Sequence, residues 1–165
     1  MKPRLIFTLI LTLINVYMVS AFYSDTTKCK MYNVKGAEVK LSQFTGKVVY
    51  LHFWASWCGP CKQFFVYSTE LKQKFTDEEL KKIEFVYVSV DEDEAAWRKA
   101  LEKVKVEGDQ WISPSKLTDG AYVYFKITSI PRFIIIDKKG KISEFIAKTP
   151  YMNDVFNDLH RLINE

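Results

Sequence analysis

The feature that most limits the fold is a nearly continuous apolar run that leads into two closely spaced cysteines. The run covers residues 48–54, and the segment Ala55–Trp57 separates it from Cys58-Gly59-Pro60-Cys61. Such a run is typical of a strand at the centre of a sheet, covered on both faces. Gly59-Pro60 favours a helix start, because proline fits the first helical turn. We therefore expect a central strand, a short loop that ends at Cys58, and a helix that carries Cys61.

The following segments alternate between strand and helix patterns. Apolar spacing predicts that the helix from Gly59 continues to about Asp77, and residues 83–90 form a second apolar run typical of a central strand. The acidic run Asp91–Glu94 is expected to open another helix as a capping box rather than to bind a metal, because acidic side chains favour helix N-termini. Thr149-Pro150 is expected to cap a final amphipathic helix over residues 152–163.

Two hairpins complete the expected sheet. Residues 31–41 turn at Lys35-Gly36, and residues 132–147 turn at residues 138–141. Residues 105–120 have no regular pattern. The order of the elements predicts an α/β domain with a central sheet flanked by helices on both faces, plus an N-terminal β-hairpin.

The N-terminus, residues 1–21, is expected to direct export. Lys2 and Arg4 precede a run without charged side chains over residues 5–24, and Val19-Ser20-Ala21 offers the small residues of a cleavage site. An uncleaved membrane anchor is the alternative, because the run has about the roughly 20 residues that a bilayer requires. Either outcome places the domain outside the cytoplasm, where cysteines can be oxidised.

Length and composition bound the rest of the chain. A length of 165 residues predicts one domain, which we place at residues 30–165 after a short linker at residues 22–29. The formal charge of +4 falls to +2 without Lys2 and Arg4, which argues against binding nucleic acid. A hydrophobic content of 48% excludes general disorder, and three cysteines are too few for a disulfide scaffold. We expect a monomer.

The spacing of Cys58 and Cys61 is shared by zinc sites and redox-active disulfides. Zinc needs two more ligands, and Cys29, His52 and His160 offer no closely spaced pair. A helix N-terminus stabilises a thiolate, and Lys62 adds a positive charge. We therefore expect Cys58 to be the nucleophile and Cys61, one turn into the helix, to be the resolving thiol.

The segment Phe53–Lys62, with Trp57, Gly59 and Pro60 around the cysteines, closely resembles the active site of thioredoxins. Together with the N-terminal hairpin and the segment at residues 41–47, it resembles exported proteins of the TlpA and ResA type, including relatives in Bacteroidetes. The resemblance covers residues 30–163. It implies a thioredoxin-like mixed sheet, a redox-active Cys58–Cys61 disulfide, no cofactor, and a domain that faces the periplasm.

The resemblance also assigns roles outside the cysteine pair. Ile130-Pro131 matches the cis-proline that lies beside the disulfide, and Arg132 is either a cation near Cys58 or a solvated strand end. His52 stands where many thioredoxins have a buried acid that moves protons, and Phe64 stands where ResA-like proteins often have a glutamate. His52 is therefore either a proton carrier or a structural side chain bonded to the backbone.

The predicted activity is thiol–disulfide exchange on disulfide-containing exported proteins, with electrons from a membrane protein. Two alternatives remain open: a thiol peroxidase of peroxiredoxin-like type, and a non-enzymatic copper-binding or adaptor protein. Cys29 has no evident partner, and we expect it to be free rather than paired with another chain.

Overall fold

A mixed sheet of seven strands, in the order β2-β1-β5-β4-β3-β6-β7, forms the centre of the computed structural model, which describes residues 29–165. Strand β3 (Val48–Trp54) lies between β4 (Ile83–Ser89), to which it is parallel, and β6 (Arg132–Ile136), to which it is antiparallel. Every residue of β3 is buried, which confirms the predicted central strand. The predicted signal segment lies outside the described residues.

Shorter strands extend the sheet on both sides. The N-terminal hairpin forms as predicted from β1 (Met31–Asn33) and β2 (Glu38–Val39), and the second hairpin ends in β7 (Ile142–Glu144), which is shorter than expected. Strand β5 (Asp109–Ile112) was not predicted. It pairs with β4 on one side and β1 on the other, so contacts distant in sequence impose its conformation.

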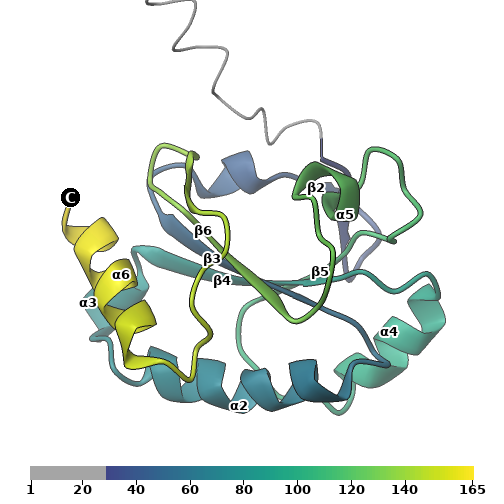
Figure 1. Ribbon diagram of the computed structural model, residues 1–165, viewed down its shortest axis with the longest axis horizontal. Coiled ribbons are helices and arrows are strands. Elements are labelled where there is room, and N and C mark those ends of the chain that lie inside the picture. Colours follow the sequence, from purple (N-terminus) through teal and green to yellow (C-terminus); the bar gives the residue numbers. More distant parts are fainter. Residues whose placement is uncertain (1–28) are drawn as a thin grey trace, which may run out of the picture.

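Helices cover both faces of the sheet, as expected (Figure 1). Figure 1 shows α2 (Gly59–Lys72) and α4 (Glu94–Leu101) along the lower face, and α5 (Ala121–Tyr124) with the 3-10 turn η2 (Leu41–Phe44) above it. Within residues 29–165, no helix combines the length and apolar character required to cross a bilayer.

Two helix boundaries differ from the predictions. Helix α2 ends at Lys72 rather than near Asp77, because Thr76 caps a separate short helix, α3 (Asp77–Leu80), in a capping box with Glu79. Helix α6 (Asn153–Asn164) follows Met152, and no side chain caps it, so the expected cap at Thr149-Pro150 is wrong.

The acidic run before α4 does not form the predicted capping box. Asp93 is the N-cap, and its carboxylate accepts hydrogen bonds from the N–H groups of Ala95 and Ala96 at 2.9 and 3.3 Å. Asp91 is buried and bonds elsewhere. Of the acidic run, only its third residue, Asp93, caps the helix.

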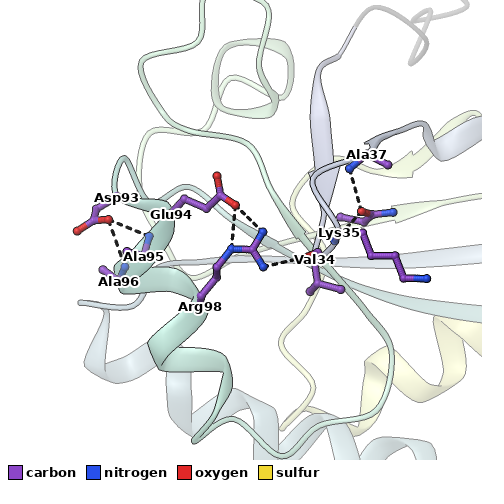
Figure 2. A network of polar contacts seen from close by, with 9 residues as sticks. Val34, Lys35, Ala37, Asp93, Glu94, Ala95, Ala96 and Arg98 are labelled. Atoms are coloured by element: carbon purple, nitrogen blue, oxygen red, sulfur yellow. Dashed lines mark hydrogen bonds and ion pairs between the residues drawn. The ribbon is translucent and has the colours of Figure 1, made fainter.

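Arg98 links helix α4 to the N-terminal hairpin through a hydrogen bond (Figure 2). The Arg98 guanidinium binds the Glu94 carboxylate one turn earlier and donates to the Val34 carbonyl at 2.7 Å. In the hairpin turn that contains Val34, the Asn33 side chain accepts hydrogen bonds from the N–H groups of Lys35 and Ala37. The bond between Arg98 and the Val34 carbonyl therefore joins the hairpin to the helix that follows the second central strand.

Candidate active site

The two cysteines of the motif form a disulfide at the start of α2. Cys58 is the N-cap residue, Pro60 lies in the first turn, and the two Cα atoms are 5.4 Å apart. The Cys58 Sγ accepts a hydrogen bond from the Cys61 N–H at 3.2 Å. Cys58 keeps 6% of its surface exposed, whereas Cys61 has none. Cys58 is thus the more exposed of the two cysteines.

The loop that leads to Cys58 is held by Asp91, which is separated from the end of β4 only by Val90. The Asp91 carboxylate accepts from the Ser56 N–H and the Ser56 hydroxyl, each at 2.7 Å, and from the Ser89 hydroxyl at 2.6 Å. Asp91 is only 2% exposed. Because these bonds are shielded from water and involve a carboxylate, they fix the loop strongly.

Asp91 is the site residue that the sequence interpretation missed. The signal was its place directly after the second apolar run, because the C-terminal ends of parallel strands meet at one edge of a sheet. This signal was overlooked because Asp91 is the first of four consecutive acidic residues, and all four were assigned to the start of a helix.

The Ile130–Pro131 peptide bond is cis, as the resemblance implied. The register of β3 and β6 pairs Phe53 with Arg132, so Pro131 lies beside the end of β3, from which the Cys58 loop departs. The Arg132 guanidinium donates to the Phe145 carbonyl at 3.3 Å and lies 5.8 Å from the centre of the Phe145 ring. Arg132, the first residue of β6, is thus partly exposed and bonded to Phe145, which agrees with the alternative of a solvated strand end.

His52 lies in β3, buried among aromatic rings. Its imidazole stacks on Phe133 with ring centres 4.5 Å apart and contacts Phe65 and Tyr87 at 5.1 and 5.8 Å. Phe64 approaches it edge-on at 6.3 Å. Burial lowers the pKa of His52 to about 3. The imidazole is therefore neutral at physiological pH, which favours the structural interpretation.

One part of that structural interpretation is wrong. We expected a backbone group to satisfy His52, but neither ring nitrogen has a hydrogen-bond partner among the described residues. Its surroundings are instead side-chain rings, which make π contacts but offer no strong acceptor. The sequence could not predict this, because the four rings come from α2, β4 and β6.

The remaining predicted residues lie around the disulfide or away from it. Trp57 is 70% exposed beside Cys58, and Lys62 is exposed on the first turn of α2. Cys29 is a free, buried cysteine, and burial together with the negative charge of Asp119 raises its thiol pKa to about 12. Among residues 29–165, no three His, Cys, Asp or Glu side chains are grouped as metal ligands.

Comparisons with known proteins agree with this geometry. The model of a thioredoxin-like family matches residues 46–142. The thiol–disulfide oxidoreductase ResA of a Bacillus cereus strain is 27% identical, over 88% of this chain and 88% of its own length. A crystal structure of a proposed thiol–disulfide oxidoreductase from Bacteroides vulgatus is 33% identical, covers 81% of this chain and 90% of that one, and has a TM-score of 0.69.

The thioredoxin domain of a thiol–disulfide oxidoreductase from Bacteroides vulgatus is 27% identical. The match covers 82% of this chain and 92% of that domain, with a TM-score of 0.68. The family match extends over more than half of the chain, and Cys58 and Cys61 occupy the Cys-x-x-Cys position. The chain therefore belongs to the thioredoxin-like family, as a thiol–disulfide oxidoreductase of the TlpA/ResA type.

Proposed function

We propose that the chain reduces disulfides of exported proteins, with Cys58 as nucleophile and Cys61 as resolving thiol. The observation that carries the proposal is the unequal exposure of the pair: Cys58, the N-cap of α2, keeps 6% of its surface exposed, and Cys61, one turn later, keeps none. A thiolate at Cys58 faces the N–H groups and the positive end of the α2 dipole, which stabilise negative charge.

The exchange takes two displacement steps. The Cys58 thiolate attacks one sulfur of a partner disulfide, the partner S–S bond breaks, and the leaving thiolate takes up a proton. Cys61, after losing its proton, then attacks the Cys58 sulfur of the mixed disulfide. This second step closes the Cys58–Cys61 disulfide and releases the partner's second thiol, so two electrons pass from the chain to the partner.

The oxidised pair must be reduced again before another cycle. We assign this step to a membrane protein that passes two electrons to the Cys58–Cys61 disulfide, because an exported domain has no access to cytoplasmic reductants. Export itself is supported by residues 1–21, with Lys2 and Arg4 ahead of an uncharged run. Cell fractionation and N-terminal sequencing test this: cleavage after Ala21 or a membrane-bound full-length chain agrees with it, and a cytoplasmic full-length chain contradicts it.

Several neighbours of the disulfide are assigned supporting roles. Trp57 precedes Cys58 and is exposed, and the cis Ile130–Pro131 bond lies beside the end of β3; we assign both to contact with the partner backbone. Gly59 has open space around its Cα, since an added Cβ would meet no atom within 4 Å. Pro60 fixes the first helical turn, and Lys62 adds a cation close to Cys58. We assign no proton-carrier role to His52, because its lowered pKa keeps it neutral.

Trapping of mixed disulfides tests the proposal. In cells that make the Cys61→Ser variant, Cys58 should remain linked to its partner, because the resolving thiol is missing. Cys58→Ser is the matched control and should capture nothing through this site. The purified wild type should reduce insulin with dithiothreitol as electron source, and Cys58→Ser should not. No capture together with no insulin reduction by the wild type would refute the proposal.

Alkylation separates an enzyme from a redox-inactive adaptor. After reduction, native protein at pH 8 should react with iodoacetamide at Cys58 and leave Cys29 unmodified, because the Cys29 thiol is buried and its pKa is about 12. Mass spectrometry of native and denatured samples identifies the labelled residues. A Cys58 that reacts only after denaturation would favour the adaptor.

A further inference from the structure

A groove lies beside α2 on the side of the helix that faces α4. Its cavity volume is about 430 Å³, and its apolar lining comes from Phe65 and Val66 of α2, from Ala100 near the end of α4, and from Val104 beyond that end. Val66 is 60% exposed, whereas Phe65 is only 6% exposed. The groove thus offers an apolar floor that is exposed mainly at Val66.

The rim of the groove is mainly positive. Lys62, Lys103 and Lys105 line it, and Glu70 is the single acidic residue among the lining side chains. This balance differs from that of the chain as a whole, in which 24 basic residues stand against 20 acidic ones. A ligand that fills the groove would meet apolar contacts below and positive charge around it.

The groove begins next to the redox-active pair. Lys62 directly follows Cys61, and Val66 and Glu70 follow at intervals of four residues, so these three side chains share one face of α2. At about 1.5 Å per residue, this face extends roughly 12 Å from Lys62 to Glu70. A protein bound to Cys58 through a mixed disulfide could therefore extend along the groove.

We infer that this groove binds an acidic peptide segment of the protein whose disulfide is reduced, with an apolar side chain on the floor and carboxylates beside the lysines. The inference rests on the proposed function. A peptide fits better than an anionic membrane surface, because the floor is concave and its volume suits one or two side chains. The groove would thus select among disulfide partners, while Cys58 and Cys61 carry out the exchange.

Two peptides of equal length, each with one internal disulfide, test this inference. One has a leucine flanked by aspartates on the C-terminal side of the disulfide, and the other has the same leucine flanked by lysines. The wild type should reduce the acidic peptide with a higher kcat/KM. The K103E/K105E variant should lower kcat/KM for the acidic peptide about tenfold, mainly through KM, since several weak ion pairs are reversed together.

The K82E/K141E variant is a matched control with the same change in net charge. Lys82 and Lys141 are exposed and lie at the end of the sheet where β3 begins, away from the disulfide. This control should reduce both peptides as the wild type does. The preference for the acidic peptide should also shrink as salt rises, because salt screens exposed charges.

The outcomes separate the inference from the proposed function. An equal loss of kcat/KM for the acidic peptide in both double variants, or no loss in K103E/K105E, would overturn the inference about the groove. Either result would leave the proposed reductase function standing. Sedimentation with vesicles of equal parts phosphatidylcholine and phosphatidylglycerol covers the membrane alternative. Binding to vesicles that K103E/K105E abolishes, without a change in peptide kinetics, would also overturn it. A wild type that reduces neither peptide nor hydroxyethyl disulfide would instead refute the reductase.

Discussion

The imidazole of His52 is uncharged and buried in β3. Because burial makes protonation of this imidazole unfavourable, the free energy of unfolding depends on pH. The rings of Phe64, Phe65, Phe133 and Tyr87 surround the imidazole. Tyr87 is the titratable group among them, and burial raises its pKa, so it too stays neutral. In the unfolded chain, His52 would accept a proton near pH 6.5, whereas in the folded protein its pKa is about 3.

Acid should therefore destabilise the protein through this residue. Because the folded-state pKa is lowered, the stabilisation is complete above about pH 6.5 and is lost as the pH falls toward about 3. The free energy of unfolding should fall by about 1.4 kcal/mol per pH unit between about pH 6 and pH 4. Urea unfolding of wild type and His52→Leu across this range measures the difference. Parallel profiles for the two proteins would contradict this prediction.

At the scale of elements, the acidic run between β4 and α4 divides its side chains among separate tasks. Asp91 anchors the Cys58 loop, Asp93 caps α4, and Glu94 binds Arg98. Glu92 accepts from the Lys116 N–H at 2.7 Å and so joins the run to the segment after β5. The sequence pattern predicted that this run opens a helix, but not that Asp93 alone caps it. The Ser56 partner of Asp91 lies 35 residues away and the Lys116 partner of Glu92 lies 24 residues away, so neither contact leaves a local pattern.

Single alanine substitutions should reveal this division. Asp91→Ala leaves the Ser56 N–H, the Ser56 hydroxyl and the Ser89 hydroxyl without their carboxylate, and should cost about 3 kcal/mol of folding stability. Asp93→Ala removes only a helix cap and should cost about 1 kcal/mol. Urea unfolding gives both values. Asp91→Ala should also slow insulin reduction more than Asp93→Ala does, because Ser56 belongs to the loop that carries Cys58; equal effects would contradict the anchoring role.

For the molecule as a whole, the features that the sequence predicted are those set by neighbouring residues, and the features that it missed depend on contacts between distant segments. Strand β3 was predicted to the residue because burial on both faces gives a continuous apolar run, and the α2 start was predicted because Pro60 marks it. Strand β5 was missed because its four residues become a strand only between β4 and β1. The disulfide position follows from local sequence, whereas the aromatic surroundings of His52 and the Asp91 anchor depend on contacts between distant elements.

The folded domain includes the N-terminal hairpin. The N-terminal hairpin is part of the core rather than an appendage: Met31 is fully buried, β1 pairs with β5, and the Ser113 hydroxyl donates to the Lys30 carbonyl at 2.7 Å. We predict that a chain of residues 22–165 folds cooperatively and reduces insulin. A chain of residues 41–165 lacks β1 and β2, exposes the edge of β5, and should be less stable by at least about 3 kcal/mol, since burying one large apolar side chain contributes about 1.5–3 kcal/mol. Thermal and urea unfolding followed by circular dichroism compare the two, and equal stability would mean that the hairpin is dispensable and that the domain begins at η2.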